Sequence, residues 1–253
     1  MLKWRHVAAI ASVLAWAVPG LASAESLKVL SAGAFKQVML GVIPQFESGG
    51  TMVQLDTDTV GGLLKRVEAG EAFDLLVASP AALETLKKAG KVADSAVALA
   101  RVGVGVGVKD GAPPPDISSV EAFKQALLKA KAVAYVDPTA GGTSGIYISQ
   151  VIDRLGIGPQ VRAKSVLVKG GSSADRIVSG EADIAIQQIS EILPVKGVVL
   201  AGPLPAEIQN YTIYAAAVAS TTSQRAAAEA LIRLLRSKSG AAVIAAKGME
   251  PVP

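Results

Sequence analysis

Short apolar runs alternate with amphipathic segments along most of the chain, and few folds accommodate this order. The run SLKVLS at 26–31 is typical of a buried strand, and the segment after it predicts a helix. Strands and helices in strict alternation predict a parallel sheet with helices on both faces. In this first round we expect strands at 26–31, 51–56 and 73–79, and helices at 35–46, 61–70 and 80–90, the first of them bent or ended by Pro44.

Residues 97–109 form a longer run in which valine alternates with glycine, VALARVGVGVGVK. Its spacing is not that of a G-x-G-x-x-G nucleotide loop, and no helix follows it. We therefore predict a strand whose glycine face lies under another backbone, crossing between two lobes. A second round of alternation follows, with helices at 118–131, 146–155 and 173–179 and strands at 132–136, 164–168 and 183–188.

The run at 211–220 predicts a second crossover strand, and two closing helices are expected at 223–238 and 240–246. Ser118 and Glu121 have the spacing of a capping box for the helix at 118–131. The prediction is an α/β fold of two lobes, each a mostly parallel sheet flanked by helices. The first lobe is expected to contain residues 25–104 and 213–253, and the second lobe residues 105–212.

The N-terminus has the order of a secretory signal. Lys3 and Arg5 precede an apolar run at 7–18, and small residues follow at 22–24. The alternative is a retained membrane anchor, but the apolar run is shorter than the roughly 20 residues that cross a bilayer. We predict a signal peptide at 1–24, cleaved after Ala24, and a protein exported to the periplasm.

The composition of the remaining chain excludes several classes of function. Loss of Lys3 and Arg5 lowers the formal net charge from +4 to +2, and both tryptophans leave with the signal, so nucleic acid is not an expected partner. The single histidine, His6, leaves as well, and the chain has no cysteine. A Ser/His/Asp triad, a cysteine nucleophile and an ordinary zinc site are therefore excluded. We expect no cofactor and no metal.

The stretch DPTAGGTSGIY at 137–147 follows a predicted strand and leads into a helix. Its glycines allow close approach of a ligand to the backbone, and Thr143 and Ser144 provide hydroxyl donors at the helix start. Free N–H groups at a helix N-terminus favour a small anion. The alternative is that Thr143 or Ser144 merely caps the helix.

Three other strand ends repeat this pattern, at 31–36, 59–66 and 169–176. Two of the four turns come from each predicted lobe, so their helix N-termini are expected to converge on a cleft. Four cations lie within about a turn of these loops, and each has the alternative of a solvated surface charge. They are Lys36, Arg66, Lys169 and Arg176.

The segments LKVLSAGAFKQVM, VGGLLKRVEAGEAFDLLVAS, VAYVDPTAGGTSGIYISQVIDRLGI and GEADIAIQQISEIL resemble the molybdate-binding group of bacterial periplasmic solute-binding proteins. The resemblance implies the type II periplasmic binding fold, closure on a ligand by hinge motion, and delivery to an ABC permease and ATPase. Members of that group hold the oxyanion with two serines, where this chain has Ala34 and Gly61 or Val60. The loss of two hydroxyl donors argues against molybdate and favours a bulkier organic anion.

The run PDISSVEAFKQALLKAKAVAYVDP and the segment GEADIAIQQISEILPVKGV resemble the branch of this fold that includes the periplasmic aconitate isomerases. That resemblance implies an allylic proton shift, which needs a base. Without histidine the candidate bases are Glu191, Asp137 and Tyr147. The alternative for Glu191 is a surface residue at a helix start.

The leading prediction is a monomeric transport protein for a small organic anion, with an aconitate isomerase as the rival and a molybdate or tungstate binder as the third possibility. Arg66 and Arg176 are the expected partners of ligand carboxylates. The other predicted ligand-binding residues are Gly33, Ala34, Gly61, Gly62, Thr143, Ser144, Gly145, Tyr147, Ser172, Gln187, Gln188 and Ser190.

Overall fold

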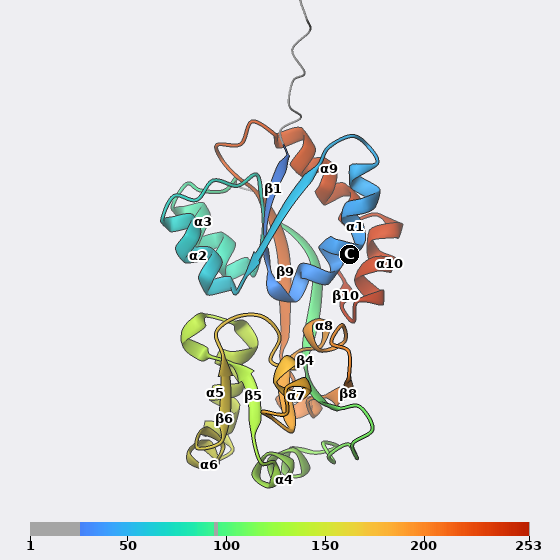
Figure 1. The fold of residues 1–253 in the computed structure, drawn as a ribbon. Helices are drawn as coiled ribbons and strands as arrows, with labels where there is room; N and C mark the ends of the chain where they lie inside the picture. Colours follow the sequence, from blue (N-terminus) through green and yellow to red (C-terminus); the bar gives the residue numbers. More distant parts are fainter. Residues whose placement is uncertain (1–25, 94–95, 253) are drawn as a thin grey trace, which may run out of the picture.

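The computed structural model describes residues 26–93 and 96–252, and within these the strands form one mixed sheet (Figure 1). The predicted signal peptide lies outside the described residues. The strand order is β2-β1-β3-β9-β4-β7-β5-β6, with β8 and β10 also paired to β4. The strands are β1 (Leu27–Ala32), β2 (Val53–Asp58), β3 (Leu75–Ala78), β4 (Val97–Lys109), β5 (Val133–Val136), β6 (Ser165–Val168), β7 (Ile184–Gln188), β8 (Val198–Pro203), β9 (Tyr211–Val218) and β10 (Glu250–Pro251).

Helices cover the sheet on both sides. In Figure 1, α2 and α3 lie on one side of β1 and β9, and α1, α9 and α10 lie on the other. The helices are α1 (Lys36–Glu47), α2 (Val60–Glu68), α3 (Pro80–Lys88), α4 (Val120–Lys129), α5 (Thr143–Arg154), α6 (Gly158–Arg162), α7 (Asp175–Val178), α8 (Ile189–Ile192), α9 (Arg225–Leu235) and α10 (Lys238–Ala246), with short 3-10 turns η1 (Gly33–Phe35), η2 (Pro138–Ala140) and η3 (Ala206–Ile208).

Two parallel groups of strands are joined by antiparallel strands, which confirms the predicted two-lobed α/β fold. In the first lobe β1 pairs in parallel with β2 and β3, and in the second lobe β5 pairs in parallel with β6 and β7. The long strand β4 pairs with β9 up to Gly103 and with β7 from Val104 onward. The exact lobe boundaries remain a prediction.

Each lobe has its own apolar core. Leu30 and Leu76 belong to the first core, and Tyr135 and Ile186 belong to the second. Strand β4 contributes to both, because its residues up to Val102 pack in the first core and those from Val104 pack in the second. The lobes therefore share one continuous strand. No helix in the described part of the chain is long and apolar enough to cross a membrane.

Helix α1 continues through Pro44 to Glu47, so Pro44 does not end it; the carbonyl of Leu40, which loses its N–H donor, lies on an exposed face where water can bind it. The predicted capping box of α4 is wrong. The cap of α4 is Ser119, whose hydroxyl accepts from the Ala122 N–H at 3.1 Å, whereas Ser118 binds Asp116. Helices α6 and α8 and strand β10 were not expected, because each is too short for its periodicity to be read, and strand β8 was not expected either.

The glycine face of β4 packs against side chains of α8 and β8 more closely than against backbone, which corrects the expectation. A Cβ placed on Gly105 would lie 2.7 Å from Cγ1 of Ile189, and one on Gly107 would lie 2.9 Å from Cγ2 of Ile192. Both contacts are too close for a real side chain. The alternation of valine and glycine therefore lets the short helix α8 lie directly on β4.

Candidate functional site

A cavity of about 550 Å³ lies between the two lobes, a size typical of small-molecule sites. Both lobes supply its lining, and Tyr214 of β9 closes it from the side of the crossover strands. The polar residues that line it are Lys36, Gln37, Thr57, Asp58, Thr59, Thr143, Ser144, Ser172, Asp175, Gln187, Ser190, Glu191, Lys196 and Tyr214, together with the backbone of Gly33, Gly142, Gly170 and Gly171.

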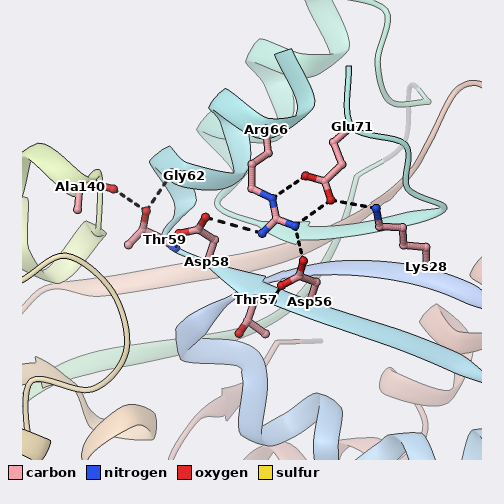
Figure 2. A network of polar contacts seen from close by, with 9 residues as sticks. All are labelled: Lys28, Asp56, Thr57, Asp58, Thr59, Gly62, Arg66, Glu71 and Ala140. Atoms are coloured by element: carbon pink, nitrogen blue, oxygen red, sulfur yellow. Dashed lines mark hydrogen bonds and ion pairs between the residues drawn. The ribbon is translucent and has the colours of Figure 1, made fainter. Parts of the chain in front are cut away.

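The lobes touch on either side of this cavity. The Thr59 hydroxyl donates to the carbonyl of Ala140 at 2.5 Å, as Figure 2 shows, and the Gly61 N–H donates to the carbonyl of Gly141 at 3.1 Å. At the other side the Ser190 hydroxyl donates to the carbonyl of Ala34 at 2.8 Å, in a buried position. The cavity is therefore bounded by direct contacts between residues of the two lobes.

Helix α5 begins at the cavity. Its N-cap residue is Gly142, which has no side chain to satisfy the N–H groups of the first turn, and Thr143 and Ser144 are the first two helical residues. The alternative that Thr143 or Ser144 caps this helix is thereby wrong. A Cβ on Gly145 would lie 2.0 Å from the carbonyl oxygen of Val136, so glycine is required for α5 to start this close to β5. The first turn presents N–H groups and hydroxyls to the cavity.

Gln187 fixes the loop that forms the opposite wall. Its side chain is fully buried, and its Oε1 accepts from the N–H of Ser173 at 2.6 Å and from the Ser173 hydroxyl at 2.8 Å. Its Nε2 donates to the carbonyl of Gly171 at 3.1 Å. Gln187 thus binds the loop through both ends of its amide, and it holds Gly170, Gly171 and Ser172 against the cavity.

Glu191 is the notable charged group of the site. Its carboxyl lies beside Gly33, where an added Cβ would be 3.1 Å from Oε1. No ion pair to Glu191 is formed within residues 26–93 and 96–252. Burial raises its pKa to about 8, against the opposing effect of a hydrogen bond with Gln187. The residue is partly exposed because it faces the cavity, and a carboxyl in this setting can act as a base near neutral pH.

The other two predicted bases lie elsewhere. Asp137 accepts hydrogen bonds from the Thr139 hydroxyl and N–H, which lower its pKa, so it serves the turn η2. The Tyr147 hydroxyl donates to the carbonyl of Ile208 at 2.8 Å. Neither residue lines the cavity. Of the three candidates, the structure places only Glu191 there.

The two predicted carboxylate-binding arginines are held by acidic residues of the protein. Figure 2 shows Arg66 between Asp56 and Glu71, with Nε donating to Glu71 at 2.6 Å. The Arg66 and Lys28 bonds lower the Glu71 pKa to about 2. Arg176 pairs with Glu181 at 3.0 Å. Neither arginine lines the cavity.

The network of Figure 2 nevertheless reaches the cavity. Arg66 lies 3.7 Å from a carboxylate oxygen of Asp58, and the other oxygen of that carboxylate accepts from the N–H of Thr59 at 2.7 Å. A Cβ on Gly62 would lie 2.4 Å from the Asp58 carboxylate, so glycine leaves room for it. Arg66 therefore acts on the site by holding Asp58 and the contact residue Thr59.

Some of the remaining predicted residues line the cavity, and others lie behind its lining or at the contact between the lobes. Those that line the cavity are Gly33, Ala34, Thr143, Ser144, Ser172, Gln187 and Ser190. Gly61 lies at the contact between lobes, and Gly62, Gly145 and Gln188 lie behind the lining. Tyr214, Asp58, Thr59 and Lys196 also line the cavity, although no sequence pattern indicated them; Tyr214 lies in the run at 211–220, which has the pattern of a plain crossover strand. Lys36 and Lys196 line the cavity from opposite lobes with exposed side chains.

Replacing Thr143 and Ser144 together with alanine is expected to weaken binding of a polycarboxylate by about 100-fold, because the Ser144 donor to a charged ligand is lost together with the hydroxyl that accepts from Gln188 beside the cavity. The protein should stay folded, since neither hydroxyl caps α5. Isothermal titration calorimetry and a thermal melt measure the two effects. Thr139→Ala is the matched control, because that hydroxyl binds Asp137 away from the cavity. Equal affinity in the double variant and the control would remove these hydroxyls from the ligand site.

The sequence of this chain is similar to those of known proteins. The family model of bacterial extracellular solute-binding proteins matches residues 27–250. An aconitate isomerase of Pseudomonas sp. is 34% identical over 256 residues, with 97% of this chain and 96% of that protein covered. No group of three or more His, Cys, Asp or Glu side chains in the described ranges could hold a metal.

Solved structures show the same fold at low identity. The periplasmic molybdate-binding protein of Azotobacter vinelandii matches with a TM-score of 0.72 and 18% identity, covering 90% of this chain and 100% of that one. The sulfate-binding protein of Mycobacterium tuberculosis matches with a TM-score of 0.73 and 20% identity, covering 90% and 87%. The chain belongs to the family of bacterial extracellular solute-binding proteins and has their two-lobed, type II periplasmic binding fold.

Proposed function

We propose that this protein is an aconitate isomerase, which interconverts cis- and trans-aconitate. The observation that carries the proposal is the carboxyl of Glu191, which faces the cavity with a pKa near 8. A carboxyl at this position repels an anionic ligand whenever it is ionised, a property that binding alone does not need. A site that removes a proton from an anion needs such a base. The 34% identity to an aconitate isomerase supports the same conclusion.

The reaction is a proton shift within a three-carbon unit. Glu191 takes a proton from the methylene carbon next to a substrate carboxylate, the C–H bond breaks, and its electron pair moves into the adjacent double bond and carboxylate. The protonated Glu191 then returns the proton to the other end of the unit, and the double bond forms in its new position. Atoms and electrons balance, so neither a cofactor nor a metal is required.

The cavity lining offers separate positions for the substrate carboxylates. The first turn of α5 offers N–H groups with Thr143 and Ser144, and the loop at 170–172 offers a second set of polar groups on the opposite wall. Lys36 and Lys196 line the cavity from opposite lobes and can contribute positive charge. These positions surround Glu191, which suits a tricarboxylate whose central carbons must face the base.

The test is proton NMR of the purified protein mixed with cis-aconitate in deuterated buffer. We expect trans-aconitate to appear, with deuterium at the position where the proton is returned in those turnovers in which protonated Glu191 exchanges with solvent first. Line broadening of the substrate without turnover would contradict the isomerase and support a carboxylate transport protein. If neither occurs, titration with molybdate, tungstate and sulfate tests the oxyanion alternative.

Transport is the second candidate, and membership of the solute-binding family favours it. In that function the same cavity would bind a polycarboxylate and the monomeric protein would deliver it to an ABC permease and ATPase. Under either function we propose the periplasm as the location, after cleavage of the signal peptide at 1–24.

Glu191 predicts opposite pH dependence for the rate of the isomerase and for the affinity that either candidate has for an unreactive ligand. For the isomerase, kcat/KM should rise about tenfold per pH unit below about 8 and level off above it, because the free enzyme must have Glu191 unprotonated. For binding of the saturated analogue propane-1,2,3-tricarboxylate, affinity should fall as pH rises through the same range, because ionised Glu191 repels the ligand. Initial rates and calorimetry from about pH 6 to 9 measure both. A rate profile that is flat across this range would contradict Glu191 as the base.

The free energy of unfolding should change with pH in the same direction as the ligand affinity. The folded protein holds the Glu191 proton more tightly than the unfolded chain does, because the pKa is raised from 4.5 to about 8. This group's contribution to the free energy of unfolding is therefore largest below about pH 4.5 and declines as pH rises to about 8. A rate that increases over the same interval cannot be attributed to a more stable fold.

A further inference from the structure

Tyr214 is a buried hydroxyl group at the cavity that neither base nor anion binding explains. It lies on β9, is 2% exposed, and lines the same cavity as Glu191. Its ring packs against Phe35 with 6.2 Å between ring centroids, so the side chain is held in place by the first core. A buried tyrosine hydroxyl needs a hydrogen-bond partner. The hydrogen bonds near Tyr214 all donate in the same direction, from Gln188 toward the cavity.

The arrangement begins at Gln188, whose side-chain nitrogen donates to the hydroxyl oxygens of Thr143 at 3.1 Å and Thr212 at 2.9 Å. The Thr212 hydroxyl also lies 3.4 Å from the Thr143 oxygen, toward which it can donate. The Thr143 oxygen is thus an acceptor, and its own hydrogen is free to donate elsewhere. Thr143 and Gln188 both act on the Tyr214 hydroxyl as donors would, and of the two only Thr143 has a hydrogen that the network has not already used.

The Tyr214 oxygen therefore accepts from the protein, and its own hydrogen remains to be donated into the cavity. Hydrogen bonds aligned in one direction polarise one another, which strengthens the last donor. Burial and the charge of Glu191 both raise the Tyr214 pKa above its usual value, so the hydroxyl stays protonated while Glu191 ionises. These properties suit a hydrogen-bond donor better than a group that must give up its proton.

We propose that Tyr214, whose hydroxyl is oriented by Thr143, which is held in turn by Gln188, is a catalytic residue that donates a hydrogen bond to the substrate carboxylate on which negative charge develops when Glu191 removes the proton. This role rests on the proposed isomerase function. Tyr214 keeps its proton throughout, and its hydrogen bond to the substrate shortens as charge moves from the breaking C–H bond into the carboxylate. Glu191 alone carries the transferred proton.

The test compares wild type with Tyr214→Phe at saturating cis-aconitate, with isomerisation and carbon–hydrogen exchange followed together by NMR. We expect kcat to fall by about 100-fold or more, with KM changed by less than about fivefold, because the bond strengthens in the transition state. Exchange and isomerisation should fall together, because both begin with the step that the donor assists. Thr143→Val, which removes the orienting hydroxyl, should show a smaller loss of about tenfold.

The matched control is Tyr135→Phe. Tyr135 is also 2% exposed, and its hydroxyl accepts from Ser165 at 3.2 Å in the second core, away from the cavity. Its kcat should equal that of wild type, and thermal melts of the variants should show that all are folded. Active wild type with kcat unchanged in Tyr214→Phe would overturn the role of Tyr214 alone. Exchange retained without isomerisation would assign Tyr214 to proton return and overturn it too. Inactive wild type would overturn the isomerase function and this role with it.

Discussion

Replacing Glu191 with glutamine is expected to lower the turnover of cis-aconitate by roughly 1,000-fold while the substrate still binds. Glutamine has nearly the same shape as glutamate but cannot accept a proton from carbon. It also removes the charge that opposes an anionic ligand, so the affinity should be unchanged or higher, above all at alkaline pH. Loss of rate without loss of binding is the signature of a group that acts in the chemical step.

The measurement combines NMR rates with calorimetric titration of cis-aconitate into the variant. Glu121→Gln is the control, because Glu121 is an exposed residue of α4 whose carboxylate accepts from Gln125 in its own helix, away from the cavity. A variant at position 191 that keeps a rate within tenfold of wild type would place the base elsewhere. If instead both rate and binding disappear while the melting temperature is unchanged, Glu191 contacts the ligand as a hydrogen-bonding group.

Replacing Gly61 with alanine is expected to weaken ligand affinity by about 10- to 100-fold and to leave the unliganded protein at least as stable as wild type. A Cβ at this position would lie 2.7 Å from Cα of Gly141, a backbone atom of the opposite lobe that cannot rotate away. The lobes would then meet with a gap, and the hydrogen bond from Gly61 to Gly141 would be lost. The ligand would remain more exposed to water.

The same substitution should weaken ligand binding but not destabilise the unliganded protein, because Gly61 lies in the first turn of α2. Alanine favours a helix over glycine by as much as about 1 kcal/mol, so a lobe that stands open gains slightly. Thermal melts without ligand and calorimetry with aconitate separate the two effects. Lys65→Ala, an exposed change in the same helix, is the control. Undiminished affinity in Gly61→Ala would show that the ligand does not require this contact.

The order of strands and helices could be predicted because most core strands are short runs dominated by apolar residues, separated by amphipathic segments. Strand β4 was expected at 97–109 and is found there, since its valines alternate along a strand buried in both cores. The glycines after helices, such as Gly70 and Gly90, have positive φ as helix ends require. These features depend on neighbours in sequence, which periodicity can report.

The site was only half predictable, because a residue's place on the cavity depends on how the lobes meet. Glu191 could be singled out from its chemistry as a possible base. Its position depends on helix α8, which lies against β4 at Gly105 and Gly107. Arg66 looked equally suitable as a ligand-binding residue. It is instead held by three acidic side chains, two of which, Asp56 and Asp58, come from strand β2. No sequence pattern indicated Tyr214, because a tyrosine in a strand is usually a core residue. Its role depends on the opposite lobe, which places Glu191 in the same cavity.

The shared strand β4 also determines the order in which the chain can complete its parts. Strand β3 pairs with β9, so the first lobe leaves an apolar strand edge unpaired until residues 211–218 have been synthesised. The second core draws on residues between 104 and 208, an unbroken stretch of chain. Contacts that are distant in sequence form slowly, and exposed apolar edges invite aggregation. The molecule should therefore fold from its middle outward, with the lobe that contains the N-terminus completed last.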